Sequence, residues 1–193
     1  KAVFLACNNG CLPVFDRCSF SSGKSSGIYG LYLLSGGRAI LNQGFTITGG
    51  YCPIYINNGF LISSSDITVS GAYYYGIKME NCGVILSAGK IDASSNDSWN
   101  ILISNGCSIV AREIKATNGS TGIRLYNNSK IFSGDDIGVS SCNEGINAQL
   151  HSVIFGKKIN VNQCGTGLSC ADSSFCLAHR IYGKTTGDNI YAE

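Results

Sequence analysis

The sequence has little charge, almost no proline and no long apolar run. Of its 193 residues, 13% are charged and two are prolines, and the formal net charge is +2. A nucleic-acid-binding surface needs clustered lysine and arginine, a disordered segment combines low hydrophobicity with high net charge, and a membrane span needs about 18 consecutive apolar residues. Because 44% of the residues are hydrophobic, the composition predicts a compact soluble chain that neither binds nucleic acid nor inserts into a membrane.

Cysteine is plentiful but lacks the spacing of a metal site. The ten cysteines form no Cys-x-x-Cys pair, and the only histidines are His151 and His179. A structural zinc site is therefore not expected, and no cofactor is implied. Cys142 and Cys164 occupy equivalent positions in the repeat described below, so their Cα atoms would lie about 5 Å apart, within disulfide reach. Stacked free thiols are the alternative.

A unit of 22 to 24 residues recurs from Ile54 to the end of the chain, which is rich in glycine, serine and asparagine (25, 25 and 17 residues). Its first apolar pair lies at Ile54/Ile56, Ile77/Met79, Ile101/Ile103, Ile123/Leu125, Ile146/Ala148 and Leu168/Cys170. A second pair is read at Phe60/Ile62, Val84/Leu86, Cys107/Ile109, Lys130/Phe132, Val153/Phe155 and Phe175/Leu177. The third is Ile67/Val69, Ile91/Ala93, Ile114/Ala116, Ile137/Val139, Ile159/Val161 and Ile181/Gly183. Three short alternating segments per unit predict three strands.

Three strands in so short a unit, with no helix between them, predict a parallel β-helix. The backbone would return above its own start, about 4.8 Å higher, and pair there in parallel. We expect one all-β domain over 1–193, a single-stranded right-handed parallel β-helix of about eight coils. Residues 1–52 form less regular coils and 53–193 regular ones. A further first strand at Ile190/Ala192 predicts that the chain is a fragment of a longer protein.

Two columns of identical residues support this coil. One column follows the first strand, where stacked amides can pair along the axis, at Asn58, Asn81, Asn105 and Asn127. The other precedes the first strand, where we expect a bend that needs a positive φ, at Gly76, Gly122, Gly145 and Gly167.

These coils resemble the right-handed parallel β-helix (pectin-lyase-like) family, which includes pectin-degrading enzymes and phage tailspikes. The segment GDDIGVSS (134–141) resembles the Asp-Asp segment of polygalacturonases, but the Gly-His-Gly and Arg-Ile-Lys motifs of those enzymes are missing, since His151 lies in QLHSV and His179 in AHRIYG. A charge-poor coil with an asparagine column looks most like a bacteriophage tailspike or tail fibre. That resemblance implies a homotrimer in the virion tail that recognises bacterial cell-surface polysaccharide, made in the host cytoplasm and acting outside the cell.

A row of charged residues precedes the third apolar pair, at Asp66, Lys90, Glu113, Asp136, Lys158 and Arg180. Glu113 and Asp136 are neighbours in this row, which would hold their carboxylates about 5 to 5.5 Å apart, as in retaining glycosidases. Mutual repulsion would raise one pKa and supply a proton donor. The alternative is a ladder of ion pairs in which Lys90 faces Glu113 and Lys158 faces Asp136. A polysaccharide-degrading glycosidase or lyase thus stays open beside a binding module.

Aromatic residues gather in the loops that lead from a third strand to the next first strand. The loops 48–53, 70–76 and 94–100 would stack on one edge, with Asn96, Asp97 and Asn100 beside the rings. We call the rings the aromatic edge: Tyr51, Tyr73, Tyr74, Tyr75 and Trp99. Flat rings suit the C–H face of a sugar, while Asp97 and the two amides would take its hydroxyls. The alternatives are that some rings pack against a neighbouring subunit or another part of the chain, or that the coil is a purely structural stalk.

Overall fold

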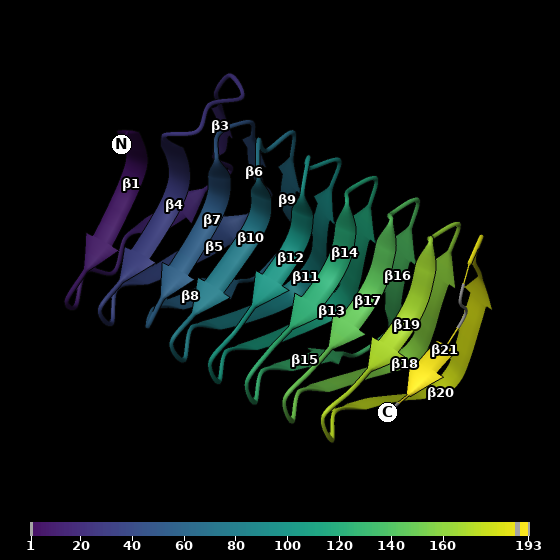
Figure 1. Ribbon diagram of the computed structural model, residues 1–193. Coiled ribbons are helices and arrows are strands. Elements are labelled where there is room, and N and C mark those ends of the chain that lie inside the picture. The colour runs from purple at the N-terminus through teal and green to yellow at the C-terminus, as the bar shows by residue number, and fades with distance from the viewer. Residues whose placement is uncertain (1, 188–189, 193) are drawn as a thin grey trace.

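The chain folds into a β-solenoid. The computed structural model describes residues 2–187 and 190–192, and it contains strands and connecting turns without a helix in those residues. Coils about 23 residues apart stack in parallel into about eight turns. Figure 1 shows the chain advancing coil by coil, with its N-terminus at one end of the stack and its C-terminus at the other. The predicted fold class is confirmed.

The first strands of the coils form one parallel sheet of nine strands, ordered along the solenoid. They are β1 (Ala2–Asn8), β4 (Ile28–Leu34), β7 (Cys52–Asn57), β10 (Tyr75–Glu80), β12 (Trp99–Ile103), β14 (Thr121–Leu125), β17 (Glu144–Ala148), β19 (Thr166–Cys170) and β21 (Ile190–Ala192). Ile77 pairs with Ile54 on one side and Ile101 on the other. Ile123 likewise lies between Ile101 and Ile146. The predicted column of first anchors is therefore confirmed in register.

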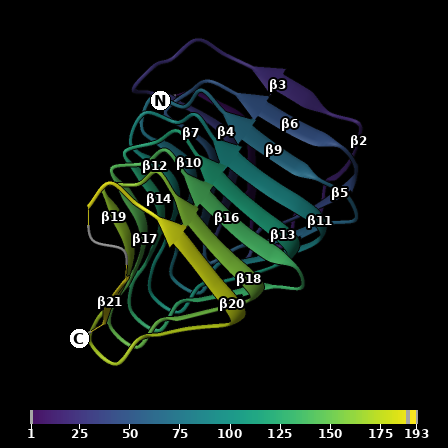
Figure 2. The same ribbon diagram turned by 90° about the vertical axis from the view of Figure 1, so that its right-hand side faces the viewer.

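The remaining strands form a second sheet of twelve strands. They are β2 (Val14–Asp16), β3 (Ser19–Ser21), β5 (Arg38–Gln43), β6 (Phe45–Thr48), β8 (Phe60–Ser63), β9 (Ile67–Ser70), β11 (Val84–Ser94), β13 (Ser108–Thr117), β15 (Lys130–Ser133), β16 (Asp136–Ser140), β18 (Val153–Asn162) and β20 (Phe175–Lys184). Three strands per coil were expected. In four coils the second and third of these are one continuous strand, namely β11, β13, β18 and β20. Figure 2 shows these long strands crossing one side of the coil.

Buried serines satisfy the backbone at the bend between the second and third segments. The hydroxyl of Ser87 donates to the carbonyls of Ser65 (3.2 Å) and Gly89 (3.3 Å). Ser133, one of the same column, donates to the carbonyl of Arg112 at 3.0 Å. Because a buried carbonyl without a partner is costly, these bonds allow the chain to turn without losing strand pairing.

The core is a column of apolar side chains that runs through all coils. The first and third anchors are buried as predicted in the coils before residue 171, for example Ile77, Ile101, Ile91 and Ile114, each fully buried. The last predicted third pair, Ile181/Gly183, is instead exposed on β20. The second anchors are a correction: the residues that point inward are Leu61, Ile85, Ile109, Ile131 and Ile154. Of the predicted second pairs only Cys107/Ile109 is buried, and the others flank the inward residue on the outer face. Since these segments are apolar on both faces, their alternation does not select a face.

The asparagine column forms the predicted ladder. The Nδ2 groups of Asn127 and Asn105 donate to the Oδ1 atoms of Asn105 (2.9 Å) and Asn81 (3.4 Å). Asn81 donates in turn to Asn57 at 3.1 Å, so the ladder starts at Asn57 in place of Asn58. Asn58, Asn81, Asn105 and Asn127 all have φ between 50° and 58°, a left-handed conformation that asparagine tolerates better than most residues.

The glycine column has a different cause from the one predicted. Gly76, Gly122 and Gly145 do not have positive φ. Instead, a Cβ at Gly145 would lie 2.5 Å from the Gly167 carbonyl oxygen, and one at Gly122 would lie 2.6 Å from that of Gly145. Glycine is required here because adjacent coils approach too closely for any side chain.

All ten cysteines are free thiols. Cys142 and Cys164 are buried in neighbouring coils, as predicted, and their thiols contact each other. The hydrogen bond between them raises the pKa of Cys142 and lowers that of Cys164. The sequence left open either a disulfide between Cys142 and Cys164 or a stack of free thiols, and the structure has the free thiols.

Candidate functional site

The three aromatic loops are adjacent rungs of the solenoid. The amide of Tyr73 donates to the carbonyl of Gly50 at 2.7 Å, and that of Tyr75 to Tyr51 at 3.1 Å. The amide of Trp99 donates to the carbonyl of Tyr74 at 3.0 Å. Backbone pairing therefore brings the loops 48–53, 70–76 and 94–100 together on one edge.

Four rings of the aromatic edge pack as two stacks that contact each other edge to face. Tyr51 and Tyr74 are parallel within 4°, with ring centroids 5.5 Å apart. Tyr75 and Trp99 are stacked at 5.1 Å. Tyr74 joins the two stacks, since its ring lies edge to face with Tyr75 (4.6 Å) and Trp99 (4.9 Å). Tyr73 presents its ring to solvent, with 47% of the residue exposed.

Three further tyrosines, which the loop positions did not predict, extend the cluster over the outer face of the first sheet. Tyr29 contacts Tyr51 at 5.6 Å and Tyr55 at 5.9 Å, and Tyr32 stacks on Tyr55 at 4.8 Å. We call the seven connected rings the aromatic face: Tyr29, Tyr32, Tyr51, Tyr55, Tyr74, Tyr75 and Trp99. Two of the three further tyrosines could have been predicted from the sequence, because Tyr32 and Tyr55 lie between inward-facing anchors and must therefore point outward.

Charged and amide groups border the aromatic face. The Lys78 ammonium lies 5.0 Å from the ring centre of Tyr75 and 5.6 Å from that of Tyr55. It also pairs with Glu80 at 2.9 Å. The Tyr55 hydroxyl donates to Glu80 at 2.7 Å and accepts from the Asn57 amide at 3.2 Å. Rings, hydroxyls, a carboxylate and an ammonium group therefore meet at one surface.

Burial and neighbouring groups determine the charge states at this surface. Burial, then the bond to Glu80, raises the pKa of Tyr55. Burial, with a smaller contribution from Tyr51, raises the pKa of Tyr75 to about 12. Burial opposes ionisation of Glu80, but its hydrogen bonds with Tyr55 and Lys78 and the Lys78 charge outweigh that effect and lower its pKa. At neutral pH the surface therefore offers neutral phenols beside an ionised carboxylate.

The polar residues predicted beside the rings divide into two kinds. Asp97 is exposed at the loop tip and forms an ion pair with Lys24 of an earlier coil. Asn96 and Asn100 are buried, contrary to the expectation that they meet a sugar. The Asn96 amide donates to Asn100 Oδ1 at 2.9 Å, and the Asn100 amide donates to the Thr117 carbonyl at 3.1 Å. These two amides hold the loop in place instead of contacting a ligand.

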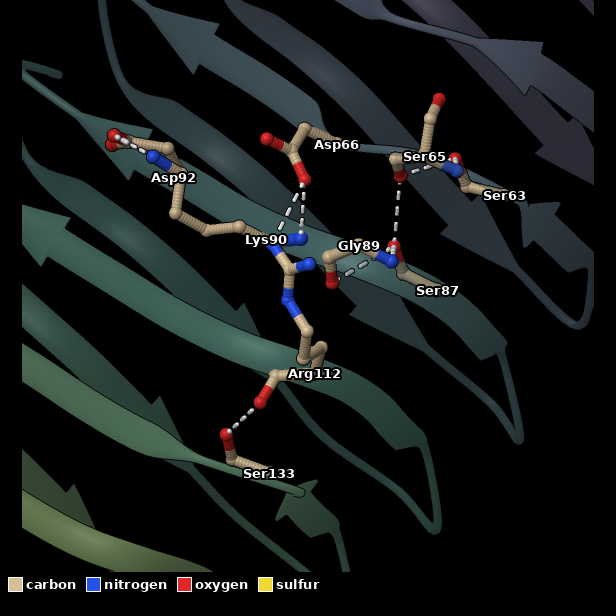
Figure 3. Close-up of polar contacts among 9 residues, drawn as sticks. All are labelled: Ser63, Ser65, Asp66, Ser87, Gly89, Lys90, Asp92, Arg112 and Ser133. Carbon is tan, nitrogen blue, oxygen red and sulfur yellow. Dashed lines mark hydrogen bonds and ion pairs between the residues drawn. The ribbon is translucent and has the colours of Figure 1, made fainter.

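The charged row lies on the outer face of the third segments, but its ion pairs differ from the simple ladder. Lys90 is the register partner of Glu113, yet its ammonium group pairs with Asp92 at 3.7 Å. The Asp66 carboxylate accepts a hydrogen bond from the Lys90 amide at 2.7 Å and pairs with Arg112 at 3.6 Å. Figure 3 shows Asp66 between these two partners. Lys158 pairs with Asp136 at 3.8 Å, as the ladder predicts.

Glu113 and Asp136 are both half-buried and line one hollow of about 250 Å³. A larger hollow of about 560 Å³ continues beyond Asp136 and contains Lys157, Lys158 and Arg180. The structure therefore places the two candidate carboxylates in a common depression with cationic groups at one end. Such a depression can accommodate a polar polymer, whether or not the two carboxylates catalyse its cleavage.

No group of three His, Cys, Asp or Glu side chains that could hold a metal ion occurs in residues 2–187 and 190–192. Over the same part of the chain, no helix is long and apolar enough to cross a membrane. Comparisons with protein-family models, with curated proteins and with solved structures find no match for this chain. The geometry of the solenoid surface is therefore the basis on which a function can be assigned.

Proposed function

We propose that this chain is a segment of a bacteriophage tailspike or tail fibre that binds bacterial cell-surface polysaccharide through the aromatic face and Tyr73. The segment belongs to a homotrimer in the virion tail and acts outside the host after synthesis in its cytoplasm. The observation that carries the binding proposal is the continuous cluster of seven rings on one face, bordered by Lys78, Glu80 and Asn57.

The chemistry of this surface supports a carbohydrate ligand. A sugar ring has an apolar C–H face and a rim of hydroxyls, and an aromatic ring with a polar tip complements both. Binding sites of this kind combine aromatic walls with a few fixed polar groups. Glu80 and Asn57 are held in place by hydrogen bonds to Tyr55, so the polar groups are preorganised beside the rings. A surface of rings along several coils also suits a polymer better than a single small molecule.

Substitutions at the aromatic face test the binding proposal. We expect Trp99→Ala and Tyr73→Ala each to weaken binding of a capsule or O-antigen polysaccharide about fivefold, because each removes a stacking surface worth roughly 1 kcal/mol. Glycan-array screening of the wild type selects the polysaccharide, and calorimetric titration gives the affinities. Tyr182→Ala is the matched control for Tyr73, since the two residues are 46% and 47% exposed and Tyr182 lies on β20.

The control also locates an alternative site. Unchanged affinity in both Trp99→Ala and Tyr73→Ala would contradict binding at the aromatic face. Weaker binding in Tyr182→Ala alone would instead assign the ligand to the charged hollow, because Tyr182 packs against Lys158 at 5.1 Å. A thermal melt of each variant separates loss of binding from loss of fold.

A polysaccharide depolymerase is the second candidate function, favoured by the position of Glu113 and Asp136 in one hollow. In this proposal one carboxylic acid protonates the leaving oxygen and the other carboxylate attacks or assists at the sugar carbon. Glu113→Gln and Asp136→Asn are then expected to reduce release of reducing ends from the bound polysaccharide at least about a hundredfold. Equal release from wild type and both variants would leave the row as an ion-pair ladder, and no release from wild type would leave a binding module or a structural stalk.

A further inference from the structure

A continuous column of apolar side chains lies on the outer face of the second segments. We call it the apolar spine: Val14, Ile40, Ile62, Leu86, Val110, Phe132, Phe155 and Leu177. Each member is the register partner of the next, so the spine contributes one residue to every coil. No charged or polar residue interrupts it. An outward strand position in contact with water would ordinarily alternate with polar residues.

The spine is exposed to solvent at every position except Ile40. Its members from Ile62 to Phe155 are 37% to 41% exposed, and Val14 and Leu177 at its ends are 56% and 53% exposed. Ile40 is half-buried. With about 40% or more of roughly 150 Å² exposed at each of the other seven positions, the spine presents about 450 Å² of apolar surface. Apolar patches above a few hundred Å² are rare on monomeric proteins and mark sites of association.

Neighbouring side chains widen the spine toward a full interface. Phe60, Val84, Val153 and Phe175 lie beside it on the same strands, and Phe175 is 57% exposed. The other positions of this neighbouring column are polar or charged, namely Arg38, Ser108 and Lys130. The four apolar side chains bring the apolar area to about 700 Å², close to the ~800 Å² that each partner buries in a standard interface. A hollow of about 420 Å³ lined by Ile40, Phe60 and Val84 interrupts the ridge near its first coils and could receive a side chain of a partner. Arg112 and Lys157 follow the spine residues at the bend, a charged rim beside an apolar centre.

The spacing of the spine restricts what can cover it. Eight coils at about 4.8 Å per coil span about 34 Å, so a partner must offer an apolar line of that length and period. An α-helix repeats its ridge about every 5.4 Å and would drift out of step by about 4 Å over this distance. A polysaccharide needs hydrogen-bonding partners, which an aliphatic and phenylalanine ridge does not provide. A second copy of this chain offers a line of equal length and identical period.

We infer that the apolar spine is a self-association surface, on which a second copy of this chain packs lengthwise, spine against spine. In a two-fold dimer the same patch on both copies packs against itself, which is an isologous contact. In a closed ring the spines of all copies face a common axis. This inference goes beyond glycan binding. It rests on the proposed homotrimer, for which it names the surface of contact between copies. The aromatic face lies on the other sheet and stays open to a ligand.

Lysine substitutions in two adjacent coils test the spine. We expect the wild-type chain to self-associate in sedimentation velocity between low and high micromolar concentration. Phe132→Lys/Phe155→Lys is expected to raise the apparent dissociation constant at least about a hundredfold, because each lysine must be buried unpaired. The matched control is Gly138→Lys/Asn160→Lys, which adds the same charge to outward register partners in the same two coils, with open space at the Gly138 Cβ. It should keep the wild-type mass.

The possible results separate the spine from the wider proposal. A monomeric wild type at high micromolar concentration would overturn both the spine and the homotrimer. A self-associated Phe132→Lys/Phe155→Lys variant, with the same sedimentation as wild type, would overturn the spine alone. Circular dichroism checks that each variant keeps its strands. If the lysine variant fails to fold, Phe132→Ser/Phe155→Ser removes the rings without adding charge, and its monomeric behaviour supports the spine while its association contradicts it.

Discussion

Gly145→Ala is expected to lower the free energy of unfolding by about 3 kcal/mol, the upper part of the usual cost of overpacking. A Cβ at this position would lie 2.5 Å from the Gly167 carbonyl oxygen and 2.5 Å from Val161 Cγ1. The carbonyl belongs to the next coil, so relief requires the two coils to separate and lengthens their backbone hydrogen bonds. Urea unfolding followed by circular dichroism measures the change from the transition midpoint at constant slope.

Gly138→Ala is the matched control for this substitution. Gly138 also lies in a strand, but nothing lies within 4 Å of the position of its Cβ. Because glycine in a strand is about 0.5–1 kcal/mol less favourable than alanine, this variant should be as stable as wild type or slightly more stable. Equal destabilisation of the two variants would contradict close coil packing as the reason for the glycine column.

Asn100→Ala is expected to lower the free energy of unfolding by about 2–4 kcal/mol. Asn100 is fully buried, and its side chain bonds both to the Asn96 amide and to the Thr117 carbonyl. Removing it leaves the backbone and side-chain N–H groups of Asn96 without an acceptor in the interior, which costs about 1–3 kcal/mol for each group, while the Thr117 carbonyl keeps its bond from the Ser95 amide at 2.7 Å. Asn96 in turn accepts a bond from the Ala72 amide at 3.0 Å, so the loss affects two aromatic loops at once.

The single tryptophan provides a local measurement of this effect. Trp99 precedes Asn100 directly and is the one tryptophan in the chain, so its fluorescence reports on the loop. We expect Asn100→Ala to shift the Trp99 emission and to lower the urea midpoint. Asn162→Ala is the control, because Asn162 is exposed at the end of β18 and surface substitutions usually change stability by less than about 0.5 kcal/mol. A similar loss in both variants would argue against the buried amide network.

The repeat predicts which aromatic residues come together on the surface, but not how their rings are oriented. Once the period is known, the stacking of Tyr51, Tyr74 and Trp99 follows from their places in the loops. The orientation of those rings does not, because it depends on ring contacts with Tyr29 of β4 and Tyr75 of β10. The burial of Asn100 is likewise a property of the packed loops, since the same residue on an open turn would meet water.

The repeat period and the inward anchors of the first and third segments are readable in the sequence, because there apolar residues alternate with polar ones along a strand. The second segments, such as Val84 to Leu86, are apolar on both faces, and in them a one-residue shift exchanges inside and outside without changing the pattern. Only the closed coil decides which face is buried, since pairing with neighbouring coils and the volume of the core admit a single register. The apolar spine could therefore be identified only from the tertiary structure, which shows which apolar residues of the second segments face outward.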